Sequence, residues 1–247
     1  MRKILTSIFN RYLPGYCLLC ERVLGSDQGN SPDHLCCHCR LTLPLNLHAC
    51  RHCALPVPGS DGFTQPICGS CITRPLAHRT FAPLIHQGAG AYLLHRLKFS
   101  RGEAEGHTLA QIMLAQIAPH VAKTPPDFLL PVPLNYWALV KRGFNQSSLL
   151  AGAIGAKLRI PVEDKLIARR RGPAQRTLSR IQRQQLARHR FIWRGRSQLD
   201  LRDKYVAVID DVLTTGATAR QIVHLLQQRG AGRVDVWCAT RAEAGAG

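Results

Sequence analysis

The chain has 247 residues, 45% of them hydrophobic, with a formal net charge of +18 and a pI near 10.2. This length accommodates one sizeable α/β domain and a small additional module. The charge predicts attraction to nucleic acid or to a polyphosphorylated small molecule, although a general enrichment in arginine would produce the same value. No apolar run approaches the roughly 18 residues of a membrane-spanning helix, which argues against a transmembrane protein.

The first residues predict a short amphipathic helix rather than a secretory signal. Polar residues interrupt the apolar stretch, and no small-residue cleavage site precedes Cys17. The apolar face of the helix would carry Ile4, Leu5, Ile8, Phe9 and Leu13. We therefore expect a cytoplasmic protein.

Nine of the ten cysteines lie within the first 71 residues, and eight of them form four C-x-x-C pairs. The pairs are Cys17/Cys20, Cys36/Cys39, Cys50/Cys53 and Cys68/Cys71. Fifteen residues separate the first two pairs and fourteen the last two, close to the spacing of zinc ribbons. A two-residue spacer lets one tight turn direct two thiolates at a tetrahedral ion, and four thiolates leave no open position. The pattern therefore predicts structural zinc.

Other uses of these cysteines fit less well. A cytoplasmic chain disfavours disulfides, and redox C-x-x-C pairs are expected singly in a βαβ unit. The spacing leaves open whether one or two ions bind and which pairs share an ion. Nearby histidines are possible substitute ligands (His34, His38, His48 and His52), and Cys37 is expected not to be a ligand. We predict a zinc module over 1–75, which depends on metal to fold, and an α/β domain over 76–247.

Strand and helix patterns alternate after the cysteine-rich segment. We expect a strand over 81–85, helices over 92–99 and from 109 to near Pro119, and a strand over 128–132. Residues 142–146 open a further helix that carries Leu149, Leu150, Ile154 and Leu158. Lys141 and Arg142 directly precede this helix, so they either bind a second phosphate group or are ordinary exposed cations.

The segment 165–199 contains no acidic residue and is rich in arginine. We expect a mobile basic loop that leads into a basic helix, suited to neutralising pyrophosphate or contacting a nucleic-acid backbone. Phe191 and Trp193 either stack on bases or, as we favour, pack into the core. Beyond this segment, 234–239 is expected to form the last strand, with Cys238 buried in it.

The most informative stretch runs from Lys204 to Thr218 and reads K-Y-V-A-V-I-D-D-V-L-T-T-G-A-T. Its apolar run, 205–209, predicts a strand buried on both faces of a parallel sheet and ending at Asp210 and Asp211. A turn and an apolar helical pattern follow. Because ligands bind outside the carboxyl ends of such strands, these carboxylates would lie beside a helix N-terminus that favours phosphate.

The turn supplies the remaining parts of a ribose-5-phosphate site. Gly216 permits close backbone approach, and the hydroxyls of Thr214, Thr215 and Thr218 are donors to phosphate oxygens. Paired carboxylates can accept from sugar hydroxyls or hold Mg²⁺. Alternatively, the two acids only end a strand and cap a helix. A Walker B strand is disfavoured because the chain has no G-x-x-x-x-G-K-[ST] loop.

The string V-I-D-D-V-L-T-T-G-A-T resembles the motif of type I phosphoribosyltransferases that binds 5-phosphoribosyl 1-diphosphate (PRPP). With the cysteine pairs, P-V-P-L followed by R-G-F-N-Q, and L-K-F at 97–99, nearly the whole chain resembles the ComF family of competence-associated proteins, including its GntX-type members. The resemblance implies a zinc finger joined to a type I phosphoribosyltransferase-like α/β fold, a parallel sheet flanked by helices. It also implies a role in the uptake or use of external DNA.

The resemblance further implies roles for individual residues. Asp210 and Asp211 would contact the ribose hydroxyls, directly or through Mg²⁺, and the 5-phosphate would be held by Thr214, Thr215, Gly216, Ala217 and Thr218. Transfer would also need a cationic clamp on pyrophosphate, for which 141–142 and 169–183 are candidates. The candidate catalytic residues are thus Asp210, Asp211, Arg142 and Arg183. In the family's basic-loop pattern Gln175, Leu178 and Arg183 match, whereas Leu186 replaces an asparagine.

We accordingly expect a PRPP-binding, phosphoribosyltransferase-like protein that acts in uptake, processing or use of external DNA. Its expected partners are PRPP, single-stranded nucleic acid on the basic face, and the DNA-uptake machinery. Two alternatives remain, a metabolic phosphoribosyltransferase for a small base and a nucleic-acid adaptor whose PRPP site is vestigial. No sequence feature identifies an acceptor base.

Overall fold

The fold is known from a computed structural model that describes residues 15–24, 34–58, 66–99, 102–170, 190–194 and 200–242. The expected amphipathic helix over 4–13 lies outside the described residues. So do Gln175, Leu178, Arg183 and Leu186 of the basic loop. These expectations stay predictions.

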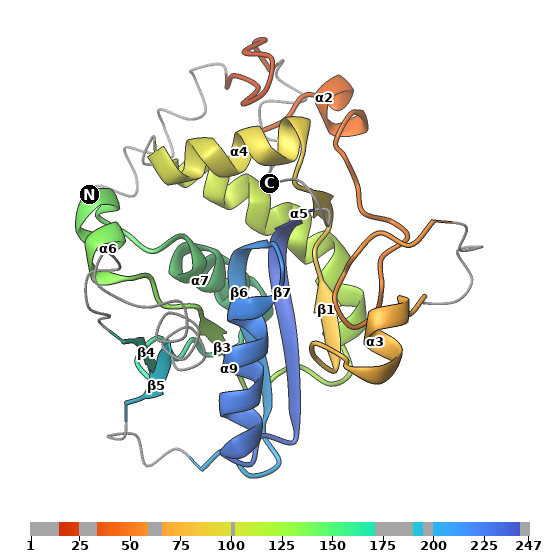
Figure 1. The fold of residues 1–247 in the computed structure, drawn as a ribbon. Coiled ribbons are helices and arrows are strands. Elements are labelled where there is room, and N and C mark those ends of the chain that lie inside the picture. Colours follow the sequence, from red (N-terminus) through yellow and green to blue (C-terminus); the bar gives the residue numbers. More distant parts are fainter. Residues whose placement is uncertain are drawn as a thin grey trace, which may run out of the picture.

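A parallel sheet forms the centre of the protein (Figure 1). Its strands are β1 (Arg79–Phe81), β2 (Leu84–Ile85), β3 (Phe128–Pro131), β6 (Tyr205–Leu213) and β7 (Arg233–Arg241). They are ordered β1-β7-β6-β3, β2 also pairs with β7, and every pairing is parallel. The parallel sheet predicted from the sequence is confirmed.

Helices cover both faces of this sheet. Figure 1 shows α4 (Gly88–Phe99), α5 (Glu103–Val121) and α7 (Gln146–Leu158) on one face and α9 (Ala217–Gln228) on the other. Strand β6 alternates between two cores, since Ala207 and Ile209 pack towards the first face and Val206 and Val208 towards the second. The prediction that this strand is buried on both faces is confirmed.

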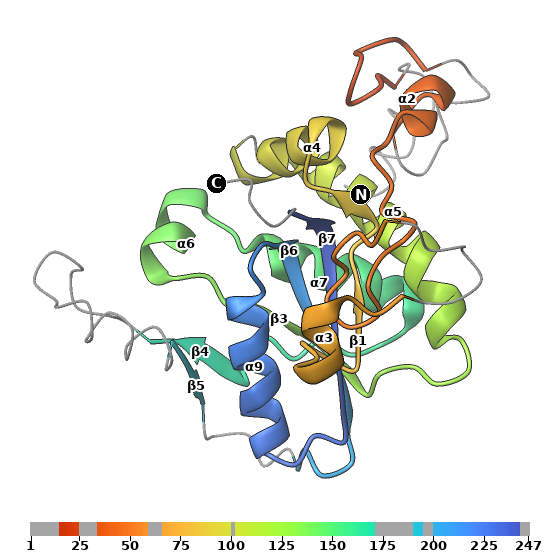
Figure 2. The ribbon, with the colours of Figure 1, turned by 45° about the vertical axis from the view of Figure 1, so that its right-hand side comes forward.

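The cysteine-rich segment contributes to both cores. Cys17, Cys36 and Cys39 belong to the first core, with α4 and α5, whereas Cys50, Cys53 and Cys71 belong to the second, with α9. The segment contains two short helices, α2 (Cys37–Leu41) and α3 (Gly69–Thr73). In Figure 2, α2 lies beyond α4, while α3 lies beside α9 and β1. The two halves of the segment therefore support opposite faces of one sheet.

The structure corrects the end of the central strand. β6 runs to Leu213 and includes both aspartates, because its ladder with β7 continues through the pairs Asp210–Cys238 and Leu213–Arg241. Backbone pairing persists where the side chains become polar, since the ladder uses only main-chain groups. Helix α5 likewise continues slightly past Pro119, to Val121.

Besides the short helices α2 and α3, three elements outside the cysteine-rich segment were not predicted. Helix α6 (Tyr136–Arg142) buries none of its residues, and its apolar side chains Tyr136, Trp137, Leu139 and Val140 are exposed. Strands β4 (Ile167–Arg169) and β5 (Phe191–Trp193) pair antiparallel at the two ends of the basic segment. Phe191 is buried in the second core, which confirms core packing for this aromatic, and the Arg229 guanidinium lies 5.0 Å from the centre of the Trp193 ring. In the part of the chain that the structure describes, no helix combines the length and apolar character needed to cross a bilayer.

Candidate functional site

The acid pair, Asp210 and Asp211, lies at the carboxyl end of β6, directly before the turn that opens α9. Gly216 adopts the left-handed conformation there, with a φ of 75°, and a Cβ at this residue would lie 3.4 Å from the Leu76 side chain. A larger residue would be strained by this backbone conformation. The predicted order of strand, acids, turn and helix is therefore confirmed.

Asp210 accepts two hydrogen bonds but forms no ion pair among the described residues. Its Oδ1 accepts from Ser147 Oγ at 3.1 Å and from the Asp211 backbone N–H at 2.9 Å. Burial, followed by the charge of Asp211, raises the pKa of Asp210 to about 7. A divalent cation or sugar hydroxyl groups would stabilise the ionised carboxylate at this position.

Asp211 differs from Asp210 because it is already paired with a cation. Lys98 Nζ lies 2.8 Å from Asp211 Oδ2, and the two side chains are only 19% and 14% exposed. His86 lies close to this pair, and burial followed by the charge of Lys98 lowers its pKa. The sequence analysis did not name Lys98 as a site residue, and its place in the L-K-F motif was the only signal.

The turn after β6 leaves hydrogen-bonding groups available. Thr214, Thr215 and Ala217 are exposed and Thr218 is half-buried. No side chain caps α9, although Thr215 Oγ1 accepts from the Ala217 N–H at 3.4 Å. The unpaired N–H groups and positive end of this 12-residue helix favour an anion.

A buried arginine joins this turn to the second group of cysteines. Arg241 Nη1 donates to the carbonyl oxygens of Leu213, at 3.0 Å, and Thr214, and its Nε donates to Cys53 O at 3.0 Å. A further short bond reaches Ala242 O. The sequence gives no local signal for this role, because the partners of Arg241 are remote in the chain.

Arg142, a predicted clamp residue, lies near the acid pair. Its Nη1 donates to Gln146 Oε1 at 3.3 Å, and the adjacent Ser147 donates to Asp210. The Gln146 Nε2 atom is buried and has no hydrogen-bond partner among the described residues. Arg183, the other predicted clamp residue, lies outside the described residues. Arg169, at the end of β4, is close enough for the charge of Asp210 to affect its pKa, which burial lowers.

The eight paired cysteines form two clusters, each built from neighbouring pairs. They are Cys17, Cys20, Cys36 and Cys39 in the first cluster and Cys50, Cys53, Cys68 and Cys71 in the second. Within each cluster the four sulfur atoms lie within 4.8 Å of one another. Cys20 and Cys36 Sγ are 3.8 Å apart and Cys53 and Cys68 Sγ 3.6 Å, close to the edge of about 3.8 Å in a tetrahedral zinc–thiolate site.

The geometry thus fits two zinc ions. Cys37 and the four nearby histidines belong to neither cluster, as the two sets show. Ten free cysteines and no disulfide are present, and all ten positions are within the described residues.

The thiols in each cluster have divergent proton affinities. Burial raises the pKa of Cys17, but hydrogen bonds led by the Cys36 N–H outweigh burial and lower it to about 6. Burial also raises the pKa of Cys68, but hydrogen bonds led by the one to Ser70 outweigh burial and lower this pKa to about 6. Burial raises the pKa of Cys71 to about 11. A divalent cation would hold all four sulfurs of a cluster as thiolates.

Comparison with known proteins is consistent with this arrangement. The chain is 30% identical over 243 residues to the DNA utilization protein YhgH of Escherichia coli O157:H7, covering 93% of this chain and 98% of that protein. The chain belongs to the ComF/YhgH family. Competence protein F of Haemophilus influenzae is 28% identical over 223 residues, covering 84% of this chain and 96% of that protein.

The ComF/YhgH chain also matches the phosphoribosyl transferase domain family over residues 145–247, the part that contains the acid pair and the turn. Such a domain implies a PRPP-type ligand. Among solved structures, purine phosphoribosyltransferase from Pyrococcus horikoshii is 18% identical, with a TM-score of 0.32, over 53% of this chain and 72% of that chain. Hypoxanthine phosphoribosyltransferase of Trypanosoma cruzi is 13% identical, with a TM-score of 0.38, over 57% and 76%.

Proposed function

We propose that the protein binds PRPP with Mg²⁺ at the acid pair and that this binding serves the uptake, processing or use of external DNA. The observation that carries the proposal is the half-buried acid pair beside the uncapped N-terminus of α9. Asp210 has no ion-pair partner among the described residues, and the first turn of α9 contains no acidic residue. Mg²⁺ would pair with the carboxylate, and the sugar phosphate would bind at the helix end.

Individual roles follow from these positions. Asp210 and Asp211 bind the ribose hydroxyls or the Mg²⁺ ion, and Thr214, Thr215, Gly216, Ala217 and Thr218 bind the 5-phosphate. Arg142, which donates to Gln146 beside the unpaired amide nitrogen of that residue, is proposed to neutralise the pyrophosphate group. Arg183 is proposed as a second clamp residue. Displacement of pyrophosphate would make the protein a phosphoribosyltransferase, with the acceptor still to be identified.

The proposal also includes structural zinc and a cytoplasmic location. Each four-cysteine cluster holds one structural Zn²⁺ ion within the cysteine-rich segment 1–75, and 76–247 forms the PRPP-binding domain. Because eight reduced thiols are needed, we assign the protein to the cytoplasm.

The link to DNA is supported by two observations. The relatives are named for DNA utilization and for competence, and this chain carries a formal charge of +18. Such a charge favours contact with the phosphates of single-stranded nucleic acid. We therefore propose single-stranded DNA, together with components of the DNA-uptake machinery, as partners.

Calorimetric titration of PRPP, with and without Mg²⁺ and a short single-stranded DNA, tests the proposed function. We expect Mg²⁺-dependent PRPP binding whose affinity changes when DNA is bound. PRPP binding that is indifferent to DNA would instead indicate a metabolic phosphoribosyltransferase. DNA binding without PRPP binding would indicate an adaptor whose PRPP site is vestigial.

The raised pKa of Asp210 predicts a pH dependence of Mg²⁺–PRPP binding. Because the metal competes with a proton whose pKa is about 7, affinity should fall by up to about tenfold for each pH unit below that value. Titrations from about pH 5.5 to about pH 8.5 would measure this change. The control is Asp210→Asn, whose residual affinity should show only the titration of the PRPP phosphates. An identical profile for both proteins would contradict the prediction.

The raised pKa of Asp210 also affects the stability of the fold, which is favoured by low pH, whereas Mg²⁺–PRPP binding is favoured by high pH. The folded-state pKa of Asp210 is above the model value of 3.8, so the folded protein holds this proton more tightly than the unfolded chain. Its contribution to the free energy of unfolding is therefore present at acid pH and is lost as pH rises through about 7. Ligand binding and fold stability thus make opposite demands on Asp210.

A further inference from the structure

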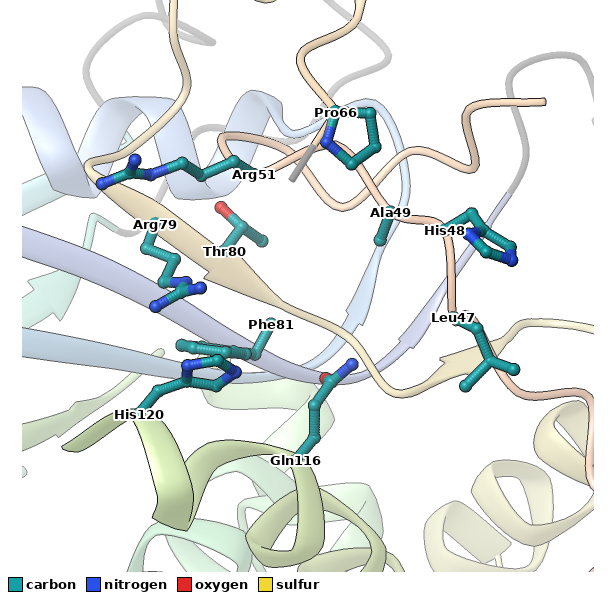
Figure 3. A pocket seen from close by; sticks show the side chains of 10 residues that line it. All are labelled: Leu47, His48, Ala49, Arg51, Pro66, Arg79, Thr80, Phe81, Gln116 and His120. Carbon is teal, nitrogen blue, oxygen red and sulfur yellow. The ribbon is translucent and has the colours of Figure 1, made fainter. Parts of the chain in front are cut away.

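A cavity lies at the edge of the sheet, away from the acid pair. Its volume is about 200 Å³, several times the roughly 30 Å³ that one water molecule occupies. The wall consists of residues from the turn 47–51, from β1 and from the last part of α5 (Figure 3). None of its lining residues belongs to the acid pair or to the turn 214–218, and β7 lies between β1 and β6.

Two arginines line this cavity, and neither has a carboxylate partner. No ion pair joins Arg51 or Arg79 to an acid among the described residues. The nearest buried carboxylate, Asp235, is already bound by Arg233, His78 and Tyr205. Burial, followed by the charge of Arg51, lowers the pKa of Arg79. Two cations that line one cavity and have no acidic partner favour an anion in that cavity.

The backbone fixes this arrangement before any ligand arrives. The Thr80 N–H donates to Arg51 O at 2.8 Å, and Thr80 Oγ1 donates to His52 O at 2.7 Å. The Arg51 N–H in turn donates to Pro66 O at 2.8 Å. The turn that carries Arg51 is therefore attached directly to the strand that carries Arg79.

The opposite wall is suited to a ligand larger than an inorganic anion. The Gln116 Oε1 atom is buried and has no hydrogen-bond partner in the described structure, so it is free to accept from a ligand. The His120 ring lies 5.2 Å from the Phe81 ring, and the Arg79 guanidinium lies 5.0 Å from the centre of the same ring. Figure 3 shows Arg79, His120 and Gln116 gathered around Phe81.

We propose that this cavity is a second ligand site, which binds a nucleotide through its phosphate group. Arg51 and Arg79 bind the phosphate oxygens, as paired guanidinium groups commonly do. Gln116 Oε1 accepts from a donor on the sugar or base, and the exposed His120 ring offers a flat surface for stacking. The site is independent of the PRPP site, since the two share no residue.

The same phosphate chemistry is available from a free mononucleotide and from a nucleic-acid strand. The test therefore uses deoxythymidine 5′-monophosphate, inorganic phosphate, and an oligothymidylate with or without a 5′-phosphate. Binding is measured on the full chain carrying Asp210→Asn and Asp211→Asn, so that the PRPP site does not contribute. A failed PRPP proposal would leave this measurement unaffected.

We expect the mononucleotide to bind, and Arg79→Gln to weaken binding about tenfold, the loss of one charge-assisted contact. The matched control is Arg74→Gln, which removes the same charge from an exposed arginine outside the cavity and should leave the affinity unchanged. Gln116→Leu should weaken nucleotide binding while raising the midpoint of thermal unfolding, because it removes an unsatisfied buried oxygen. A folded variant that loses binding thus separates recognition from stability.

The outcomes are distinct. Binding of the mononucleotide or of the 5′-phosphorylated strand alone identifies a terminal phosphate as the ligand, and equal binding of both strands identifies internal phosphates. Affinity for inorganic phosphate equal to that for the nucleotide would overturn the proposal, because Gln116 and His120 would then contribute nothing. Equal losses in Arg79→Gln and Arg74→Gln, or no binding of any probe, would also overturn it.

Discussion

Replacing Asp210 and Asp211 together by alanine is expected to reduce the affinity for PRPP in the presence of Mg²⁺ by at least about 100-fold. The expectation follows because each carboxylate would lose a charge-assisted contact worth roughly 1.5–3 kcal/mol. Ser147 Oγ and Lys98 Nζ would lose their acceptors, and the site would lose the negative charge that attracts Mg²⁺. Isothermal titration calorimetry measures the change directly.

Two controls make this result specific. Asp164→Ala with Asp200→Ala removes the same two charges from exposed residues and should leave the Kd for PRPP unchanged. Asp210→Asn with Asp211→Asn keeps the shape of the site and should lose binding without loss of fold. A dissociation constant in the alanine variant equal to that of the unmodified protein would refute PRPP binding at the acid pair.

Removal of metal is expected to have the largest effect on stability. We expect two Zn²⁺ ions per chain, and a strong chelator should lower the midpoint of thermal unfolding by more than about 10 °C, because structural zinc contributes many kcal/mol to folding. From the sequence alone, unfolding would be confined to 1–75. The presence of Cys50, Cys53 and Cys71 in the core of β6 and α9 predicts that it extends into the α/β part.

Single cysteine variants would separate the two clusters. Cys20→Ser and Cys68→Ser each remove one ligand, from the first and the second cluster, and each should lower the zinc content to one ion. Only Cys68→Ser should also weaken PRPP binding, because Arg241 joins Cys53 O to the carbonyl groups of Leu213 and Thr214. Cys37→Ser, outside both clusters, should retain both ions. A full metal content in Cys68→Ser would contradict the assignment.

The sequence predicted the parts of this protein whose signals are local. The apolar run before Asp210, the glycine turn and the helix after it form one continuous pattern, and the structure places them together. The cysteine spacing identified the eight residues that form the two clusters. It did not determine how the pairs combine, because the spacing of the pairs is compatible with more than one combination.

Contacts between segments that are far apart in the chain could not be predicted from the sequence. Lys98 pairs with Asp211 across more than one hundred positions, and Arg241 reaches Cys53 from the opposite end of the chain. Helix α6 has only seven residues and buries none of them, so its apolar side chains do not mark a face of the core. The extension of β6 through two aspartates depends on its ladder with β7, which side-chain patterns do not report.

The position of the second cluster has a consequence for how the protein is made. Its four thiols precede β6, α9 and β7 in the chain, and these later elements complete the core around Cys50, Cys53 and Cys71. During translation these thiols therefore lack their packing partners until β6, α9 and β7 have been synthesised. Nascent chains would therefore need a reducing environment and early metal capture, and zinc starvation should harm newly made protein far more than protein that has already folded.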